Sequence, residues 1–327
     1  MGACPLQQDF RSEVGFVIKG PDNNAGVGDR CLRASVGGQS VPEDAIVDDL
    51  RRFDINRPET GGATPFAHGY RAHQRLGVDH KRAIDADVLH LQRLGLDAYR
   101  IHVWDREVSD RRGNLVENEH LDLFDYLLSR LAARGIKVLL TPIAWWPAGY
   151  PEPDPGSEGF AEGYSKEDMS TDLRVRRAQA NYLAQFASHR NPYTGLTYAE
   201  DPNIIAFEIF NEPRHPAGPE ETTRYVDAMV DALRGAGLEK PIFYNISENF
   251  TPEHGGAVCA ARIQGVAHQW YPTGLVRNGE VGGNMLPNVD SYPIPYADFP
   301  ECGDKARMVY EFDSADVGGS YMYPAMA

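Results

Sequence analysis

The stretch LDLFDYLLSRLAARGIKVLLTPIAWW, residues 121–146, joins a helix to a buried strand through a glycine. Its first half carries apolar residues at intervals of three and four, such as Leu121, Phe124 and Leu131, which is the spacing of one helix face. Gly135 stands where helices commonly end in a left-handed turn. The run after it is almost continuously apolar, as in a strand that is covered on both faces of a parallel sheet. The stretch therefore predicts one unit of an α/β fold.

The same order of helix, glycine and strand recurs along the chain. Apolar residues with helical spacing mark four segments, and Gly95, Gly135 and Gly237 each stand just before a strand. The predicted helices are 83–96, 121–136, 174–189 and 221–237. The predicted strands are 14–20, 98–104, 137–146, 204–210, 241–247, 265–271 and 307–313. This order is typical of parallel strands that are connected by helices.

Two architectures use such units, and the sequence favours the barrel. A doubly wound sheet usually has a glycine-rich phosphate loop after its first strand, but the chain contains no G-x-G-x-x-G motif. A (β/α)8 barrel has eight strands and about 250 residues, and seven strands are counted before Ala327. We therefore predict one domain over residues 1–327, a TIM barrel truncated after its seventh strand, with 1–12 as a tail.

Long connections follow three of the predicted strands. They cover about residues 21–80, 147–171 and 272–305, and a connection as long as the first is expected to hold a small hairpin or a displaced helix. In a barrel, the connections that follow strands lie on the carboxyl-end face, where active sites are built.

Composition and charge exclude several classes of partner. The net charge is −15, from 47 acidic and 32 basic residues, which argues against nucleic acid and against an anionic membrane surface. The first ten residues do not have the pattern of a signal peptide, and the longest apolar run, near 138–146, is too short to cross a bilayer. We expect a soluble chain, secreted or periplasmic only if the full-length protein carries a signal. Oligomeric state is left open.

Cofactor and metal chemistry find no support in the sequence. The four cysteines are too few and too scattered for a disulfide scaffold or a zinc site, although one bridge is compatible with their number. The chain has no His-x-His, no H-E-x-x-H and no G-x-S-x-G motif. We predict no cofactor and no metal.

Two glutamates mark the ends of buried strands. The first is Glu212 in IIAFEIFNEP, residues 204–213, and the second is Glu311 in MVYEFD, residues 308–313. The Asn211-Glu212-Pro213 tripeptide alone would also fit the start of a helix, with Asn211 as its cap. A carboxylate at the end of an apolar strand is costly unless it is paired or functional. Two of them, on strands that face each other across a barrel mouth, predict carboxylates on either side of one substrate bond.

This pair of motifs resembles the retaining glycoside hydrolases of clan A. The clan includes the family 5 cellulase and mannanase group and the barrel domains of family 2 β-galactosidases, and the resemblance runs from about Val14 to the end of the chain. It implies that Glu212 is the acid/base and that Glu311 is the nucleophile. It also implies that Arg100 hydrogen-bonds the nucleophile and that Asn211 holds the sugar 2-hydroxyl.

Further residues are candidates for substrate contact. The strand-six motif of the clan, a histidine with an aromatic residue after it, is similar to His268-Gln269-Trp270-Tyr271, and either Trp270 or Tyr271 would face the nucleophile. The aromatic that the clan carries after strand eight has no counterpart in this sequence. Tryptophans at predicted strand ends fit both a sugar platform and the core, and His102 and Tyr244 have less support. These tryptophans are Trp104, Trp145 and Trp146.

The sequence thus predicts a retaining hydrolase that cleaves a β-linked glycoside or polysaccharide by double displacement. A carbohydrate is the expected partner. The alternative is a catalytically inactive, carbohydrate-binding pseudoenzyme or barrel fragment, because an incomplete barrel leaves strand edges unpaired. The sugar, the linkage and the choice between exo and endo action stay open.

Overall fold

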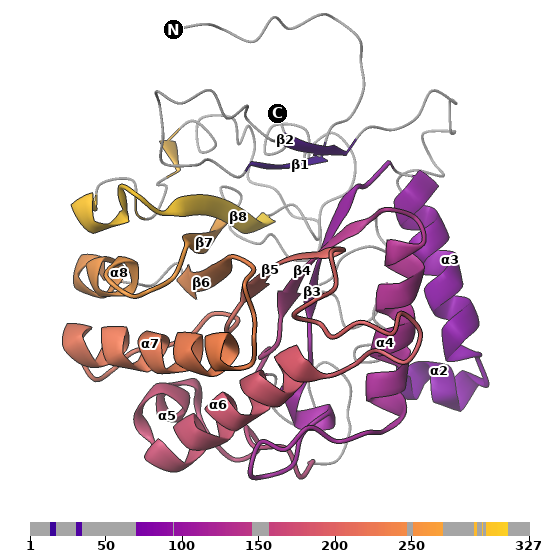
Figure 1. The fold of residues 1–327 in the computed structure, drawn as a ribbon, viewed down its shortest axis with the longest axis horizontal. Helices are drawn as coiled ribbons and strands as arrows, with labels where there is room; N and C mark the ends of the chain where they lie inside the picture. The colour runs from indigo at the N-terminus through magenta and orange to yellow at the C-terminus, as the bar shows by residue number, and fades with distance from the viewer. Residues whose placement is uncertain are drawn as a thin grey trace, which may run out of the picture.

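The computed structural model describes residues 14–17, 31–34, 70–93, 95–145, 157–246, 251–270, 291–292, 296 and 299–312. Its centre is a parallel sheet of six strands in the order β3-β4-β5-β6-β7-β8 (Figure 1). The strands are β3 (Ala98–His102), β4 (Lys137–Thr141), β5 (Ile204–Glu208), β6 (Ile242–Ile246), β7 (Gly265–Trp270) and β8 (Ala306–Phe312). Each strand pairs with the next one in the chain, so the order never reverses as it does in a doubly wound sheet. These six strands are arranged as in part of a (β/α)8 barrel, the fold class that the sequence predicts.

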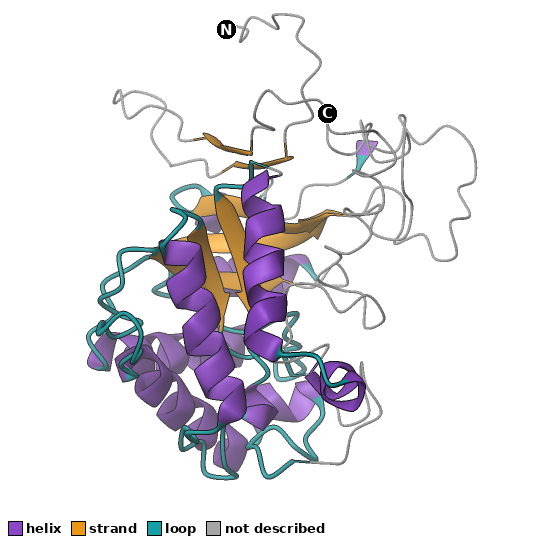
Figure 2. Ribbon diagram, turned by 90° about the vertical axis from the view of Figure 1, so that its right-hand side faces the viewer, coloured by secondary structure: helices purple, strands orange, loops and turns teal. Residues whose placement is uncertain are grey.

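Helices cover the outer side of this sheet (Figure 2). They are α2 (Tyr70–Leu76), α3 (His80–Arg93), α4 (Glu119–Ala132), α5 (Lys166–Thr171), α6 (Leu173–Ser188), α7 (Pro219–Gly235) and α8 (Pro252–Cys259). Short 3-10 turns are formed by η1 (Asp105–Glu107) and η2 (Pro300–Cys302). Gly95, Gly135 and Gly237 have positive φ angles of 73°, 71° and 84°. These glycines therefore end their helices in the left-handed conformation that the sequence predicts.

The strands bury side chains on both faces, and the two faces form separate clusters. Val138 and Leu140 of β4 pack with the helices in the main hydrophobic core. Leu139, between them, points to the other face. There it joins a small inner cluster with one or two residues from each following strand, namely Ala206, Phe243, Ala267, Met308 and Tyr310. Packing on both faces explains why these strands read as continuous apolar runs.

One predicted strand has a different place. The segment 14–20 was expected to be the first strand of the parallel sheet, but β1 (Val14–Val17) pairs antiparallel with β2 (Cys31–Ala34) in a separate two-stranded sheet. The apolar run VGFV predicts a strand correctly. Its partner depends on where the chain returns, which local pattern does not specify.

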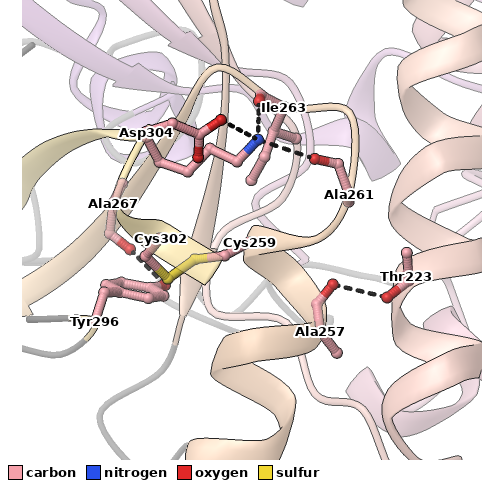
Figure 3. Close-up of a disulfide and its surroundings, with 10 residues drawn as sticks. Thr223, Ala257, Cys259, Ala261, Ile263, Ala267, Tyr296, Cys302 and Asp304 are labelled. Carbon is pink, nitrogen blue, oxygen red and sulfur yellow. Dashed lines mark hydrogen bonds and ion pairs between the residues drawn. A yellow bond between two sulfur atoms is a disulfide. The ribbon is translucent and has the colours of Figure 1, made fainter. Parts of the chain in front are cut away.

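A disulfide joins the end of α8 to η2 (Figure 3). Cys259 and Cys302 are 43 residues apart in sequence and their Cα atoms are 5.0 Å apart. Beside them, Lys305 Nζ donates to the carbonyl oxygens of Ala261 and Ile263 at 3.3 and 3.1 Å. Bridge and lysine together fix the connection between α8 and β7 against the start of β8.

No helix in the described part of the chain combines the length and the apolar character that a membrane span needs. The predicted tail, residues 1–12, lies outside the described residues.

Candidate active site

A buried ion pair joins the middle of β3 to the carboxyl end of β5. The Arg100 and Glu208 side chains are 1% and 0% exposed, and Arg100 Nε donates to Glu208 Oε2 at 2.7 Å. Glu208 also accepts from Thr141 Oγ1 at 2.7 Å and from Asn245 Nδ2 at 3.0 Å. Each oxygen of this carboxylate is therefore satisfied, which a buried charge requires.

Arg100 organises the residues next to this pair. Its Nη2 donates to Asn211 Oδ1 at 3.1 Å, and its Nη1 contacts His102 Nε2. The guanidinium also lies over the ring of Tyr310 on β8, 4.1 Å from the ring centre. Arg100 therefore links β3, β5 and β8, and it fixes the asparagine that precedes Glu212. The predicted contact of Arg100 with Glu311 stays a prediction, because the Glu311 side chain lies outside the described residues.

Glu212 follows β5 in a left-handed backbone conformation, with a φ angle of 52°. A non-glycine residue adopts this conformation rarely, and such strain is concentrated at functional sites. Its side chain is 30% exposed. Two donors hold the carboxylate, since Lys166 Nζ of α5 lies 3.4 Å from Oε2 and Gln269 Nε2 of β7 donates to Oε1.

The strand register brings the backbone of Glu311 to the carboxyl end of the sheet, where Glu212 also lies. Gln269, which contacts Glu212, pairs in register with Glu311 of β8. Neighbouring strands are about 4.8 Å apart, so the backbone of Glu311 lies one strand away from the residue that holds Glu212. The register of β7 and β8 shifts between His268 and Gln269. Such an irregularity changes where a side chain points and is common next to active sites.

Trp145 lies four residues after the end of β4 and shares a neighbour, Lys166, with Glu212. It too has a left-handed backbone, with a φ angle of 52°, and its backbone N–H donates to Asp105 Oδ1 at 2.9 Å. Its indole N–H donates to the Tyr164 carbonyl at 2.9 Å, and Lys166 Nζ lies 5.5 Å from the ring centre. Trp145 is thus connected to the candidate acid/base through Lys166, whereas Trp104 is 3% exposed and belongs to the core.

Burial shifts the pKa of three groups around this edge. It raises the pKa of Asp105 to about 6, against the lowering effect of backbone N–H donors. It lowers the pKa of His268 to about 4, assisted by the positive charge of Arg307. It lowers the pKa of His215 to about 3, assisted by His254. Both histidines are therefore neutral at pH 7.

His268 and Tyr244 lie in buried surroundings. The His268 ring is 6.2 Å from that of Tyr296, and neither ring nitrogen has a hydrogen-bond partner among the described residues. Tyr244 is fully buried, and its hydroxyl pairs with His215 Nε2 at 2.9 Å. Tyr244 therefore supports the loop that follows Glu212. His102, in contact with Arg100, is 7% exposed.

Several predicted site residues cannot be placed. Trp146 and Tyr271 lie outside the described residues, as do the side chains of Trp270 and Glu311. The sequence reasoning missed Lys166, Glu208 and Gln269. Glu208 stands inside the quoted motif, where a charge in an apolar run was a usable signal, and Gln269 stands between two quoted residues. Lys166 has no motif around it. Within the described ranges, no group of three His, Cys, Asp or Glu side chains is arranged to hold a metal ion.

Comparison with known proteins finds relatives that are named mannan endo-1,4-beta-mannosidases. No family model matches the chain. It is 28% identical over 191 residues to mannan endo-1,4-beta-mannosidase 1 of Oryza sativa subsp. japonica, which covers 55% of this chain and 42% of that protein. It is 24% identical over 144 residues to mannan endo-1,4-beta-mannosidase 7 of Arabidopsis thaliana, covering 44% of this chain and 32% of the relative. The chain thus spans less than half the length of these relatives.

The solved structures that match the chain have low sequence identity to it. An endo-1,4-beta-mannanase from Rhizomucor miehei matches at 20% identity with a TM-score of 0.47, covering 59% of this chain and 63% of that one. A glycoside hydrolase family 5 mannosidase from the same organism matches at 16% with a TM-score of 0.49, covering 67% and 59%. The mannosidase relatives confirm the predicted resemblance: the chain is similar to the clan A glycoside hydrolases of the cellulase-like family 5.

Proposed function

We propose that this chain carries the two catalytic glutamates, Glu212 and Glu311, of a retaining β-glycoside hydrolase that acts on β-linked mannans. The substrate class is taken from the relatives, which are named mannan endo-1,4-beta-mannosidases. The observation that carries the proposal is the position of Glu212. It lies four residues after the end of β5 in a strained backbone conformation, and it is held by Gln269, the register partner of Glu311.

The two glutamates have different tasks in a double displacement. In the first step, the Glu311 carboxylate attacks the anomeric carbon, and Glu212 gives its proton to the departing glycosidic oxygen. In the second step, Glu212 takes a proton from water, whose oxygen displaces Glu311 from the same carbon. Each displacement inverts the configuration at the anomeric carbon, so the two steps together keep the β configuration in the product.

The buried network at β3 and β5 suits the task of holding the substrate. Asn211 uses its amide oxygen to accept from Arg100, so its NH2 group is the side that can donate to a sugar hydroxyl. Trp145 offers an aromatic ring near Lys166, the lysine that contacts Glu212, and aromatic faces pack well on the apolar face of a sugar ring. These roles, and those of His268 and Trp270, are part of the proposal.

Variants of the two glutamates test the mechanism. Glu212→Ala should keep cleaving an activated aryl β-mannoside, and added azide should raise its turnover, because azide needs no general base. Glu311→Ala should lose nearly all activity, and azide should then give the product of inverted configuration. Glu253→Ala, on the exposed first turn of α8, is the control and should match the parent protein.

The substrate is tested with the unmodified chain. Release of reducing ends from mannan should exceed release from β-glucan and xylan. Rescue in the reverse pattern would exchange the two roles. Full activity in both alanine variants would overturn the mechanism, and binding of mannan without cleavage would favour the carbohydrate-binding pseudoenzyme.

A further inference from the structure

The ammonium group of Lys166 contacts the carboxylate of Glu212, the candidate acid/base. Lys166 Nζ lies 3.4 Å from Glu212 Oε2, and the Lys166 side chain is only 12% exposed. The same ammonium lies 5.5 Å from the centre of the Trp145 ring. A lysine is rarely held this far from water without a partner of opposite charge, and this one lies between a carboxylate and an aromatic face.

The helix that carries Lys166 is fastened to the loop that carries Glu212. Ser170 Oγ of α5 donates to the Arg214 carbonyl oxygen at 2.6 Å, and Arg214 Nη1 pairs with Glu167 Oε1 at 2.8 Å. At the start of α5, Ser165 and Asp168 form a capping box. The position of Lys166 relative to Glu212 is therefore set by several contacts and not by one flexible side chain.

Three arginines near this site have carboxylate partners of their own. Arg100 pairs with Glu208, Arg214 with Glu167, and Arg106 with Glu107 and Glu162. Gln269, the second group on Glu212, is a neutral donor. Lys166 is thus the positive charge that the described residues place in contact with the Glu212 carboxylate.

We propose that Lys166 is a positioning residue that stabilises the carboxylate form of Glu212, the form that Glu212 takes as it gives up its proton. The proposal rests on the function proposed above. When the glycosidic bond breaks, the proton passes to the leaving oxygen and negative charge develops on Glu212. An ammonium that is already in place at 3.4 Å lowers the energy of that charge without rearrangement.

This role makes the effect of Lys166 depend on the leaving group. A poor leaving group, such as a sugar alcohol, needs the proton from Glu212 in the transition state. A 2,4-dinitrophenolate leaves without it. Loss of the ammonium should therefore slow the first kind of substrate and spare the second, whereas a damaged fold would slow both.

The experiment compares Lys166→Met with the parent protein on an alkyl β-mannoside and on 2,4-dinitrophenyl β-mannoside. We expect kcat/KM to fall about tenfold for the alkyl substrate, the size of one charge-assisted hydrogen bond, and to be unchanged for the activated one. Lys166→Arg keeps the positive charge and should retain most of the activity. Lys137→Met is the matched control, since Lys137 begins β4 at the opposite end of the sheet and contacts the Pro202 carbonyl.

A double-mutant cycle shows whether Lys166 acts through Glu212. In the Glu212→Ala background, Lys166→Met should cost nothing more on the alkyl substrate, because the carboxylate that it serves is gone. The same loss in both backgrounds, or an equal loss on both substrates, would overturn the role of Lys166. If Glu212→Ala itself left the alkyl reaction unchanged, both this inference and the proposed acid/base would be overturned; a defect specific to Lys166 leaves the two-glutamate mechanism standing.

Discussion

Arg100 and Glu208 form a buried ion pair, and removing either partner would leave the other charge unpaired. Arg100→Met would leave the Glu208 carboxylate with two neutral donors, Thr141 and Asn245, in a place without solvent. Breaking a buried ion pair from one side typically destabilises by about 3–5 kcal/mol. We expect a loss of this size in the free energy of unfolding, measured with urea. Adding Glu208→Gln to this variant should recover part of the loss, and a loss below about 1 kcal/mol would contradict the importance of the pair.

Asp105 makes stability depend on pH. Burial raises its pKa to about 6 from an ordinary 3.8, so the folded chain binds this proton more tightly than the unfolded one. The free energy of unfolding should therefore fall as pH rises from about 4 to about 6, by up to roughly 3 kcal/mol. Asp105→Asn keeps an oxygen for the Trp145 N–H and carries no charge. Urea unfolding at pH 4.5 and pH 7.5 should show a smaller drop for the variant, and an equal drop would exclude Asp105 as its source.

Strands and helices were predictable where the pattern is local. The six strands of the parallel sheet all lie within the predicted apolar runs or differ from them by one residue, and the glycines that end helices are read directly from the sequence. The antiparallel pairing of β1 with β2 was not predictable, because the segment 31–34 shows no alternation that marks it as a partner. Local pattern gives the type of an element, while its neighbour depends on the path of the chain.

β6 and β7 pack closely where Gly265 meets the ring of Phe243, and a small substitution there tests this contact. A Cβ atom on Gly265 would lie 2.2 Å from the Phe243 ring, which belongs to the inner cluster. Gly265→Ala should therefore push β7 away from β6 and lower the free energy of unfolding by about 1–3 kcal/mol. Gly235→Ala is the control, since its Cβ would meet nothing within 4 Å at the end of α7, and alanine favours helix. A neutral Gly265→Ala would mean that the ring can move aside.

The candidate site could be predicted only in part, because local sequence pattern does not show which distant segments become neighbours in the fold. Glu212 and Asn211 were predicted because they directly follow the apolar run 204–210, and Arg100 because it lies in the predicted strand 98–104. Lys166 and Gln269 come from α5 and β7, 46 and 57 residues from Glu212. Their contact with it arises only when the sheet curves and α5 packs on the loop after β5. A sequence motif records the strand end, and the fold supplies the groups that surround it.

The disulfide affects the stability of the entire fold, because it closes a long loop of the chain. The segment between Cys259 and Cys302 contains β7, which carries Gln269, and the connection from β7 to β8. Gln269 is the residue of this segment that contacts Glu212. Closing a loop of 43 residues reduces the entropy of the unfolded chain, which corresponds to about 4 kcal/mol at 25 °C. A reducing agent should therefore lower the midpoint of urea unfolding of the parent protein.

The double variant Cys259→Ala/Cys302→Ala separates this effect from a general action of the reductant. It should unfold at the lower urea concentration with or without reductant, since no bridge is left to break. It should also lose activity at lower urea concentrations than the parent, because β7 and β8 are no longer tied to α8 and the edge that carries Gln269 and Glu311 opens first. A variant that unfolds like the oxidised parent would show that Cys259 and Cys302 are unlinked in solution. In that case the packing of Tyr296 against His268, and the bonds from Lys305 to Ala261 and Ile263, would be enough to hold this edge.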